Sequence, residues 1–448
     1  MALILSALAE QLCDYSDIRH FRVALSGGMD SIVLLHSMAR LRDKGVDWQL
    51  SAVHVHHGLN AAADDWSRFC DTTCQTLNIP YTLFQVDASP VPGESPEATA
   101  RVLRYQALAG VMVGGDALLT GHHQDDQAET LLLQLMRGCG PSGLAAMPKA
   151  TAFSAGLLVR PFLAYSRQQL LEYATEQNLD WVEDSSNRDS RYDRNYLRHD
   201  ILPQLITRWP GVVSSLCRTA SNMAEASFLL DELAKQDLQQ VKTPQIGVLK
   251  LEGLLALNDT RLRNLLRFWL RELHLPVPSH TQMQHIFSDV IHARVDSNPC
   301  VTWSGVEIRR YRGNLYALAT LTAVGPEQDI VWDLSAPITI NGVGSLRLRK
   351  TQGMGLNPDL LARTDLCIRF RQGGERIQPA RRGHQHELKK LFQEAGIPPW
   401  ERDRTPILYQ GDAIVAVAGL CDSAAFCVGE DQKSLLLEWD KCFFDTLN

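Results

Sequence analysis

The sequence predicts an α/β fold: a doubly wound parallel sheet, followed by a helical domain and a small α+β C-terminal domain. Three observations lead to this prediction. Short apolar runs alternate with helical patterns over the first 200 residues, long helical patterns replace them from about Val212, and turn-rich strand patterns follow residues 322–329. We expect domains at 1–212, 213–325 and 326–448.

The first domain is predicted to begin with a surface helix over residues 1–15, which lacks the basic start and cleavage site of a signal peptide. Strands are predicted at 21–25, 49–55, 81–86 and 117–121, and a helix at 31–43. Ligands of a doubly wound sheet bind at the carboxyl ends of its strands. Motifs that directly follow these strands are therefore candidate site residues.

The later domains show other patterns. Helices are expected over 215–240 and 261–273, and their apolar faces would allow a homodimer. The last domain is expected to contain a helix at 386–396 and a strand at 413–419 among turns.

Composition excludes several classes of protein. With 45% hydrophobic and 21% charged residues, the chain is neither disordered nor fibrous. No apolar run approaches the roughly 18 residues that a membrane span requires. Ten cysteines without a CxxC pair are typical of reduced thiols in a cytoplasmic protein, rather than of a disulfide framework or a zinc or iron–sulfur site.

Charge is distributed unevenly. The net charge of −7 argues against indiscriminate binding of nucleic acid. Residues 1–100 carry six Lys/Arg against twelve Asp/Glu, whereas residues 363–404 carry ten against six. This asymmetry indicates a small charged ligand or metal at one end and a polyanion at the other, or else solvated faces of opposite sign.

The sequence SGGMDS (26–31) follows the first predicted strand and precedes a helix. Glycines let the backbone approach a ligand, serines supply hydroxyl groups, and a helix N-terminus directs amides at an anion, which together predict a phosphate-binding turn. It is not a Walker A loop, because no G-x-x-x-x-G-K-[ST] sequence occurs. The alternatives are the nucleophile elbow of an α/β-hydrolase, with Ser26 as nucleophile, and a turn with a structural role alone.

The sequence TGHHQDDQAET (120–130) follows the fourth predicted strand and opens a helix. His122, Asp126 and Glu129 have the spacing i, i+4 and i+7, so they share the helix face directed at the ligand. Carboxylate oxygens such as those of Asp126 suit Mg²⁺ held jointly with phosphates. The alternatives are zinc on His122, His123 and Asp126, and an acidic first turn that complements the helix dipole.

Two weaker clusters accompany these motifs. HVHHGL (54–59) ends the second strand, where a purine ring would rest on backbone and imidazole. EATARVLRY (97–105) places Glu97, Arg101, Arg104 and Tyr105 at helical spacing. Either cluster by itself fits a structural role equally well.

The motifs SGGMDS, HVHHGL, EATARVLRY, GHHQDDQAET, WVEDSSN (181–187) and YDRNYLR (192–198) together resemble the PP-loop ATP-pyrophosphatase superfamily and, within it, the bacterial tRNA(Ile)-lysidine synthetase family. RQGGER (371–376), LKKLFQEAGIPPW (388–400) and RTP (404–406) resemble that family's C-terminal domain. The resemblance implies ATP-dependent ligation of free lysine to C2 of the wobble cytidine of the CAU-anticodon tRNA(Ile). An adenylated cytidine would be the intermediate, pyrophosphate and AMP would be released, and the lysidine product would read AUA instead of AUG.

The resemblance also implies roles for single residues. ATP binding is expected from Ser26, Gly27, Gly28, Met29, Asp30, Ser31, His54 and Gly121. Catalysis is expected from Asp30, Arg101, His122, Asp126 and Glu129. Asp126 is the expected Mg²⁺ ligand, and Glu129 and Asp30 are the candidates to hold or deprotonate the lysine ammonium. Arg101 would stabilise phosphoryl charge, with Arg104 as the alternative. Contact with tRNA is expected from Arg194, Asn195, Arg198, Arg371, Arg376, Arg381, Arg382, Lys389, Lys390 and Trp400.

Some alternatives remain open at this level. Residues 194–198 would equally suit ion pairing with Glu183 and Asp184, and the C-terminal basic residues would suit a solvated face. His56 and Asn60 depart from the family pattern, and no ligand role is expected for them. The alternative functions are another PP-loop enzyme, such as a tRNA thiolase, and a catalytically silent RNA-binding protein. A thiolase of the cytidine-modifying kind would be expected to have CxxC pairs, which this sequence lacks.

Overall fold

The computed structural model describes residues 2–56, 58, 63–87, 96–184, 189–294, 297–320, 329–361, 366–429 and 432–441. The chain forms two compact units, Met1–Leu229 and Leu230–Asn448, and the boundary between them in the sequence falls within the long helix α10 (Val212–Val241). The predicted domain boundaries remain predictions, and the one at 325/326 lies outside the described residues.

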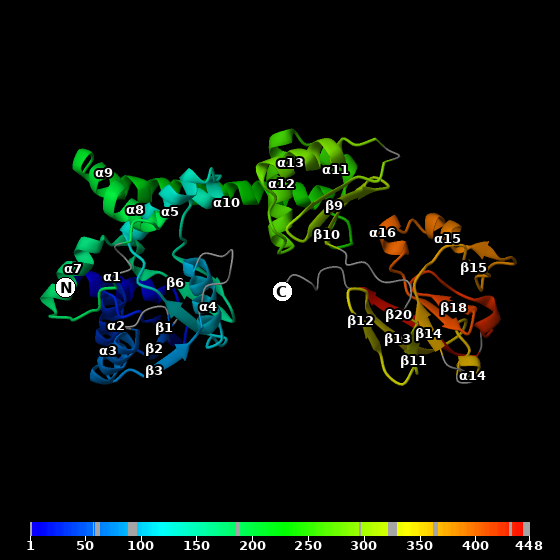
Figure 1. Ribbon diagram of the computed structural model, residues 1–448, viewed down its shortest axis with the longest axis horizontal. Helices are drawn as coiled ribbons and strands as arrows, with labels where there is room; N and C mark the ends of the chain where they lie inside the picture. Colours follow the sequence, from blue (N-terminus) through cyan, green and yellow to red (C-terminus); the bar gives the residue numbers. More distant parts are fainter. Residues whose placement is uncertain are drawn as a thin grey trace. The chain divides into compact units, whose positions relative to one another are not determined.

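The first unit contains the predicted doubly wound sheet (Figure 1). Its strand order is β3–β2–β1–β4–β6–β5, and all strands except β5 are parallel. The strands are β1 (His20–Ala24), β2 (Gln49–His56), β3 (Tyr81–Gln85), β4 (Asp116–Leu119), β5 (Ala150–Phe153) and β6 (Gly156–Val159). The strands expected from the sequence are thus confirmed. The strand order reverses between β1 and β4, which is where such sheets bind ligands.

Helices cover both faces of this sheet because its central strands are apolar on both faces. In β4, Leu118 and Leu119 are both fully buried, and neighbouring residues of a strand point to opposite faces. Leu119 packs in a core with helices on one face, and Leu118 packs in a core with α4 on the other. The helices of the first face are α1 (Ala2–Cys13), α2 (Met29–Arg42), α3 (Ala63–Thr76) and α7 (Arg167–Glu176), and α4 spans Pro96–Ala109.

The region predicted as helical contains the expected helices and, in addition, an antiparallel sheet of order β7–β10–β9–β8 that the sequence analysis did not predict. The strands of this sheet are short and follow long stretches of helical periodicity. The helical periodicity was therefore the stronger signal in the sequence, and the strands were missed. The apolar face of α12, including Leu265 and Trp269, packs against this sheet in one core with Ile308. The elements are α11 (Leu251–Leu255), α12 (Asp259–Glu272), α13 (His280–His285), β7 (Val248–Lys250), β8 (Cys300–Trp303), β9 (Val306–Tyr311) and β10 (Asn314–Ala319).

The C-terminal residues form the predicted small α+β fold, with antiparallel sheets of order β11–β14–β17–β18–β19, β12–β13–β20 and β15–β16. The predicted helix at 386–396 is α15 (Leu388–Glu394), and the predicted strand at 413–419 is β18 (Ala413–Val417). The other main elements are β11 (Ile330–Trp332), β12 (Ile338–Ile340), β13 (Gly344–Gln352), β14 (Leu366–Arg369), β15 (Arg376–Ile377), β16 (His386–Glu387), α16 (Pro399–Arg402), β17 (Ile407–Gln410), β19 (Cys421–Asp422) and β20 (Lys433–Lys441).

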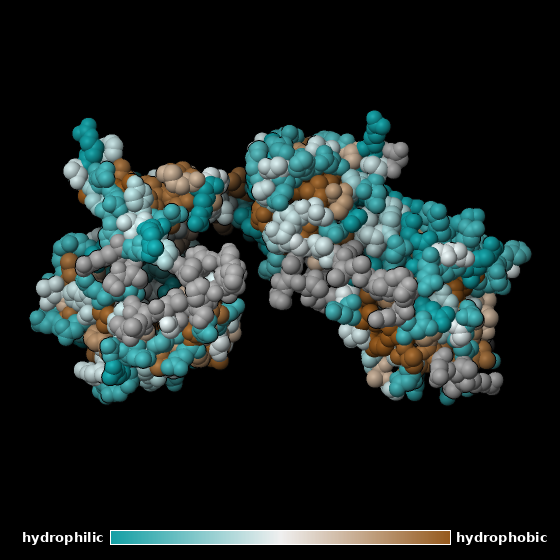
Figure 2. Space-filling model, in the orientation of Figure 1, coloured by the Kyte–Doolittle hydropathy of each residue, from teal (hydrophilic) through white to brown (hydrophobic). Residues whose placement is uncertain are grey.

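Figure 2 shows apolar side chains along α10, the helix in which Phe228 and Leu229 are 63% and 66% exposed. Pairing of two chains through this helix remains a prediction. None of the helices in the described part of the chain is long and apolar enough to span a membrane.

Candidate active site

The predicted phosphate-binding turn joins β1 to α2 and is held by its own serines. The Ser31 hydroxyl donates to the carbonyl of Gly28 at 2.9 Å and accepts from the amide of Ser26 at 3.2 Å. Gly27 has a φ of +85°, and a Cβ there would lie 3.2 Å from the Cys70 sulfur, so this position requires glycine. The turn therefore places hydroxyl groups and backbone at the carboxyl end of β1.

The motif after β4 touches this turn. A Cβ on Gly121 would lie 2.8 Å from the carbonyl oxygen of Asp30, so only glycine allows the two loops to approach this closely. The Thr120 hydroxyl lies 2.8 Å from Nδ1 of His122. Burial lowers the pKa of His122 to about 4, which leaves this imidazole neutral at physiological pH.

His123, which the sequence analysis considered only as a zinc ligand, lies at the centre of the site. Its buried ring is 3.4 Å from Asp126, 3.5 Å from Asp125 and 3.6 Å from Asp30. Burial favours the neutral ring, but attraction to Asp125, Asp30 and Asp126 outweighs burial and raises the pKa of His123 to about 10. His123 is therefore a fixed cation among three carboxylates.

Two arginines from a distant segment bind the remaining carboxylates. The side chain of Glu129 is 1% exposed and accepts from Nε of Arg194 at 2.7 Å and from Nε of Arg198 at 2.6 Å. Oδ1 of Asp126 accepts from Nη2 of the same arginines, at 3.0 Å and 2.9 Å. We call Asp30, His122, His123, Asp126, Glu129, Arg194 and Arg198 the reaction centre.

These contacts keep Asp126 ionised. Burial by itself would raise the pKa of Asp126, but the charges of His123, Arg194 and Arg198 prevail and lower it to about 2. Its second oxygen, Oδ2, accepts from the backbone amide of His123 at 3.0 Å. Both oxygens of Asp126 are thus occupied within the chain.

The segment that supplies the arginines changes from one helix type to another. Arg194 lies in α8 (Asp193–Tyr196), and Arg198 lies in the π-helical segment Leu197–Ile201. Such π-helical turns are rare and frequently occur at functional sites. The side chain of Asn195 donates to a backbone carbonyl at 3.0 Å. Contact of these residues with tRNA remains a prediction.

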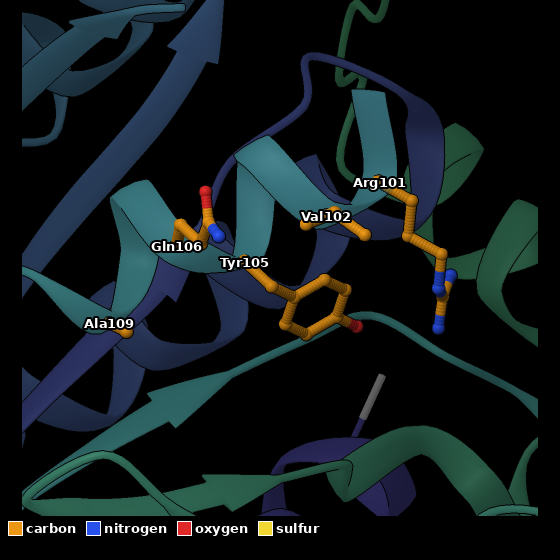
Figure 3. Close-up of a pocket in the computed structure, with 5 residues that line it drawn as sticks. All are labelled: Arg101, Val102, Tyr105, Gln106 and Ala109. Atoms are coloured by element: carbon orange, nitrogen blue, oxygen red, sulfur yellow. The ribbon is translucent and has the colours of Figure 1, made fainter. Parts of the chain in front are cut away.

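Two further predicted residues flank the reaction centre. His54 is buried, and its Nδ1 lies 2.7 Å from the carbonyl oxygen of Leu25, at the end of β1. The guanidinium of Arg101 lies 5.1 Å from the centroid of the Tyr105 ring (Figure 3), and its charge is one of those that lower the pKa of His122. The purine contact of His54 remains a prediction.

Most of the C-terminal basic residues are exposed. Figure 2 shows hydrophilic side chains over β15 and α15. Arg382 pairs with Glu394 at 2.7 Å, and the less exposed Arg371 pairs with Asp403 at 3.1 Å. The exposed members, which we call the basic surface, are Arg376, Arg381, Arg382, Lys389 and Lys390. Contact between the basic surface and tRNA remains a prediction.

Trp400 lies in an apolar cluster and not on the basic surface. It is 9% exposed, and its ring centroid lies 5.3 Å from that of Tyr316 and 6.0 Å from that of Tyr311. A stacking contact between Trp400 and tRNA would require this cluster to open.

Comparisons with known proteins identify the relatives of this chain. Family models match residues 3–205 as a PP-loop domain, 249–316 as a TilS substrate binding domain and 366–439 as a TilS substrate C-terminal domain. The chain is 43% identical to the tRNA(Ile)-lysidine synthase of Coxiella burnetii, over 94% of this chain and 92% of that protein. It is 42% identical to the enzyme of the same name from Methylococcus capsulatus, over 94% and 96%.

Among solved structures, a U34-tRNA thiolase from Methanococcus maripaludis matches 50% of this chain and 79% of its own, with a TM-score of 0.44 and 19% identity. The curated relatives match at much higher identity and over nearly their whole length. The chain therefore belongs to the tRNA(Ile)-lysidine synthase family of PP-loop ligases, which use ATP to form a carbon–nitrogen bond.

Proposed function

We propose that this chain joins the ε-amine of free lysine to C2 of the wobble cytidine in a tRNA(Ile) with a CAU anticodon. ATP would activate the cytidine as an adenylate, and lysidine, pyrophosphate and AMP would be the products. One observation carries the proposal: the phosphate-binding turn after β1 and the charged motif after β4 touch where the strand order reverses, in a chain of this family. The modified anticodon would read AUA instead of AUG.

In the first step, the C2 oxygen of cytosine would attack the α-phosphorus of ATP, and the bond to pyrophosphate would break. The turn Ser26–Ser31 would hold the departing pyrophosphate through amides and hydroxyls. Arg101 would offset the charge on the phosphoryl oxygens. His122, neutral because burial lowers its pKa to about 4, would donate a hydrogen bond without adding charge.

In the second step, the lysine ε-amine would attack C2 and expel AMP. Lysine arrives as an ammonium ion, and Glu129 would accept the proton that it must lose before it can attack. We assign the ammonium to Glu129, whose oxygens already bind Arg194 and Arg198. It would replace one guanidinium, and this exchange leaves the charge of the buried cluster unchanged.

The carboxylates of the site fit Mg²⁺ in a particular way. Both oxygens of Asp126, the ligand expected from the sequence, accept hydrogen bonds within the chain, whereas Oδ1 of Asp30 is buried without a partner. We therefore assign the ion to Asp30, and Asp126 would join only after an arginine had moved. When bound, Mg²⁺ would neutralise phosphate charge. In the described ranges, no three His, Cys, Asp or Glu residues form a metal site, which suits an ion that takes most of its ligands from phosphates and water.

The test is incorporation of labelled lysine into unfractionated bacterial tRNA, with ATP present or omitted. We expect incorporation that requires ATP and survives mild alkaline deacylation, since a base modification is not an ester. Release of pyrophosphate with tRNA and a different nucleophile would assign the chain to another modification. Absence of any ATP-dependent reaction would support a silent RNA-binding protein.

A further inference from the structure

The reaction proposed above gives no task to His123, although its ring lies between the two motifs of the site. Nε2 is 3.6 Å from Oδ2 of Asp30, at the start of α2, and 3.4 Å from Oδ2 of Asp126, in α5 (Gln124–Met136). The side chain of His123 is 2% exposed, so salt and water screen these contacts little. His123 therefore links the turn after β1 to the helix after β4.

The ring is also held from its other side. Nδ1 lies 3.5 Å from Oδ2 of Asp125, and the same oxygen accepts a hydrogen bond from the backbone amide of Arg167 at 2.8 Å. Arg167 is the first residue of α7, so the N-terminus of a second helix fixes Asp125. The backbone amide of His123 donates to Asp126 at 3.0 Å. The fold thus sets the position of the ring before any ligand binds.

The loop after β4 holds Asp30 at two points. Gly121 packs so closely against the backbone of Asp30 that a Cβ on the glycine would lie 2.8 Å from the carbonyl oxygen. His123 contacts the side chain of Asp30 at Oδ2. The other carboxylate oxygen, Oδ1, is buried without a hydrogen-bond partner. With the backbone and Oδ2 both held, Oδ1 is the oxygen of Asp30 that remains for a cation.

Without His123, the two carboxylates that it joins would repel each other. Oδ2 of Asp30 and Oδ2 of Asp126 both lie within 3.6 Å of one ring nitrogen, and like charges that are this close favour separation. Asp126 is fixed, since its Oδ1 is bound by Arg194 and Arg198. The side chain of Asp30 is 34% exposed, so Asp30 is the member of the pair that would turn away.

We propose that His123 is a positioning residue for Mg²⁺: it holds Oδ2 of Asp30 beside Asp126 and thereby leaves Oδ1 as the oxygen that the ion takes. Groups that orient a metal ligand in this way commonly contribute about 10–100-fold to metal affinity. The inference rests on the proposed function, because it takes Mg²⁺ bound together with ATP as the ligand. The alternative is a structural role alone, since His123 is the residue at which α5 begins.

Two substitutions separate the two nitrogens of the ring. The amide of a glutamine reaches about the position of Nε2, and its two N–H groups can donate to Asp30 and Asp126. The amide of an asparagine reaches only about the position of Nδ1, on the side of Asp125. Asparagine is also a favoured residue at the start of a helix, so His123→Asn preserves the start of α5.

The measurement is the Kd for ATP in the absence of tRNA, with Mg²⁺ and with EDTA. We expect Mg²⁺ to tighten ATP binding by the wild type, and His123→Asn to lose about tenfold or more of this gain, whereas His123→Gln keeps it within about threefold. The control is His20→Gln, which should keep the whole gain. His20 begins β1, at the end of the strand away from the site, and pairs with Ser51 at 2.8 Å. In EDTA, all four proteins should bind ATP within about threefold of one another, because each retains the phosphate-binding turn.

An equal gain from Mg²⁺ in His123→Asn and the wild type would overturn the inference. So would a loss in His123→Gln as large as that in His123→Asn, since the contact at Nε2 would then not be the one that matters. An equal loss of ATP binding with Mg²⁺ and with EDTA would leave the ring a structural role alone, and absence of any gain in the wild type would remove Mg²⁺ from Asp30. Lysine incorporation by the wild type tests the proposed function separately, because ATP binding requires neither lysine nor tRNA.

Discussion

Two glutamates of this chain each bind two arginines, one inside the first unit and the other on the surface of the second. The side chain of Glu129 is 1% exposed, whereas that of Glu438 is 24% exposed and lies on β20 opposite β13. Their partners are Arg194 and Arg198 in the first case, and Arg347 and Arg349 in the second. The same three charged groups therefore occur in two different dielectric environments.

The difference shows what each cluster does. An exposed ion pair adds little to stability, because water screens it and its long side chains lose entropy. A buried carboxylate requires charged partners, because removal of one member of a buried ion pair leaves the other charged group with neither a partner nor water to stabilise it. The cluster at Glu129 is also adjacent to His123 and Asp126, so its charges are fixed before any substrate arrives. Charges positioned in this way can stabilise a developing charge, and in the proposed function one guanidinium gives way when lysine binds.

The largest effect should come from Glu129→Gln. The substitution leaves two partly buried guanidinium groups to share the single carboxylate of Asp126, so we expect lysine incorporation to fall by about 10²–10³-fold or more and stability to fall by about 3 kcal/mol. Rates of incorporation and urea unfolding would measure both. Glu438→Gln, in the exposed cluster, is the matched control and should leave both quantities near the wild-type values. Equal effects of the two substitutions would break the comparison.

Asp126→Asn should separate chemistry from binding. We expect pyrophosphate release to be abolished, since the substitution removes the charge that His123 and both arginines surround, while tRNA binding is largely retained. Filter binding and a pyrophosphate assay provide the two readouts. Loss of tRNA binding comparable with the loss of pyrophosphate release would show that the reaction centre also holds the bulk of the tRNA.

The buried cluster should also make the free energy of unfolding depend on pH. The pKa of Asp126 is about 2 in the folded chain, against an ordinary value of 3.8. The lowered pKa corresponds to a stabilisation of about 2 kcal/mol, complete above about pH 5 and lost as the pH falls through 3.8 toward 2. We expect the difference in unfolding free energy between the wild type and Asp126→Asn to shrink over this interval. A difference that is independent of pH would contradict the account.

The smallest effect belongs to the basic surface. The double substitution Lys389→Ala and Lys390→Ala should weaken tRNA binding by about tenfold and reduce the slope of log Kd against log salt by about one to two. ATP binding should not change. Lys44→Ala, at an exposed lysine of the first unit, is the control. Unchanged salt dependence in the double variant would mean that the basic surface is a solvated face.

Local sequence was enough to predict four of the six strands of the sheet, β1 to β4, and the two loops of the site, whereas β5 and β6 were missed. A strand followed by a glycine-rich or charged motif is visible in a short window, and the rule that ligands bind at strand ends brings the two motifs together. The partners of the carboxylates were not predictable in this way. Arg194 lies 65 residues after Glu129, and no local pattern joins them.

The two adjacent histidines show the same limit. His122 and His123 are the same residue type at adjacent positions, yet their pKa values are about 4 and about 10. Burial lowers the pKa of His122, whereas the neighbouring carboxylates raise the pKa of His123. Protonation depends on what the fold places around a ring. Trp400 is a third case, since its aromatic side chain among basic residues suggested RNA contact, while the fold uses it in an apolar cluster.

The proposed function requires the reaction centre to activate the cytidine by adenylation before lysine attacks. The most direct measurement is transfer of label from ATP labelled at the α-phosphate to the CAU-anticodon tRNA(Ile) in the absence of lysine. We predict labelled tRNA with the wild type and release of the label as AMP when lysine is added. Release of pyrophosphate with no label on the tRNA, or label on the protein, would contradict the account.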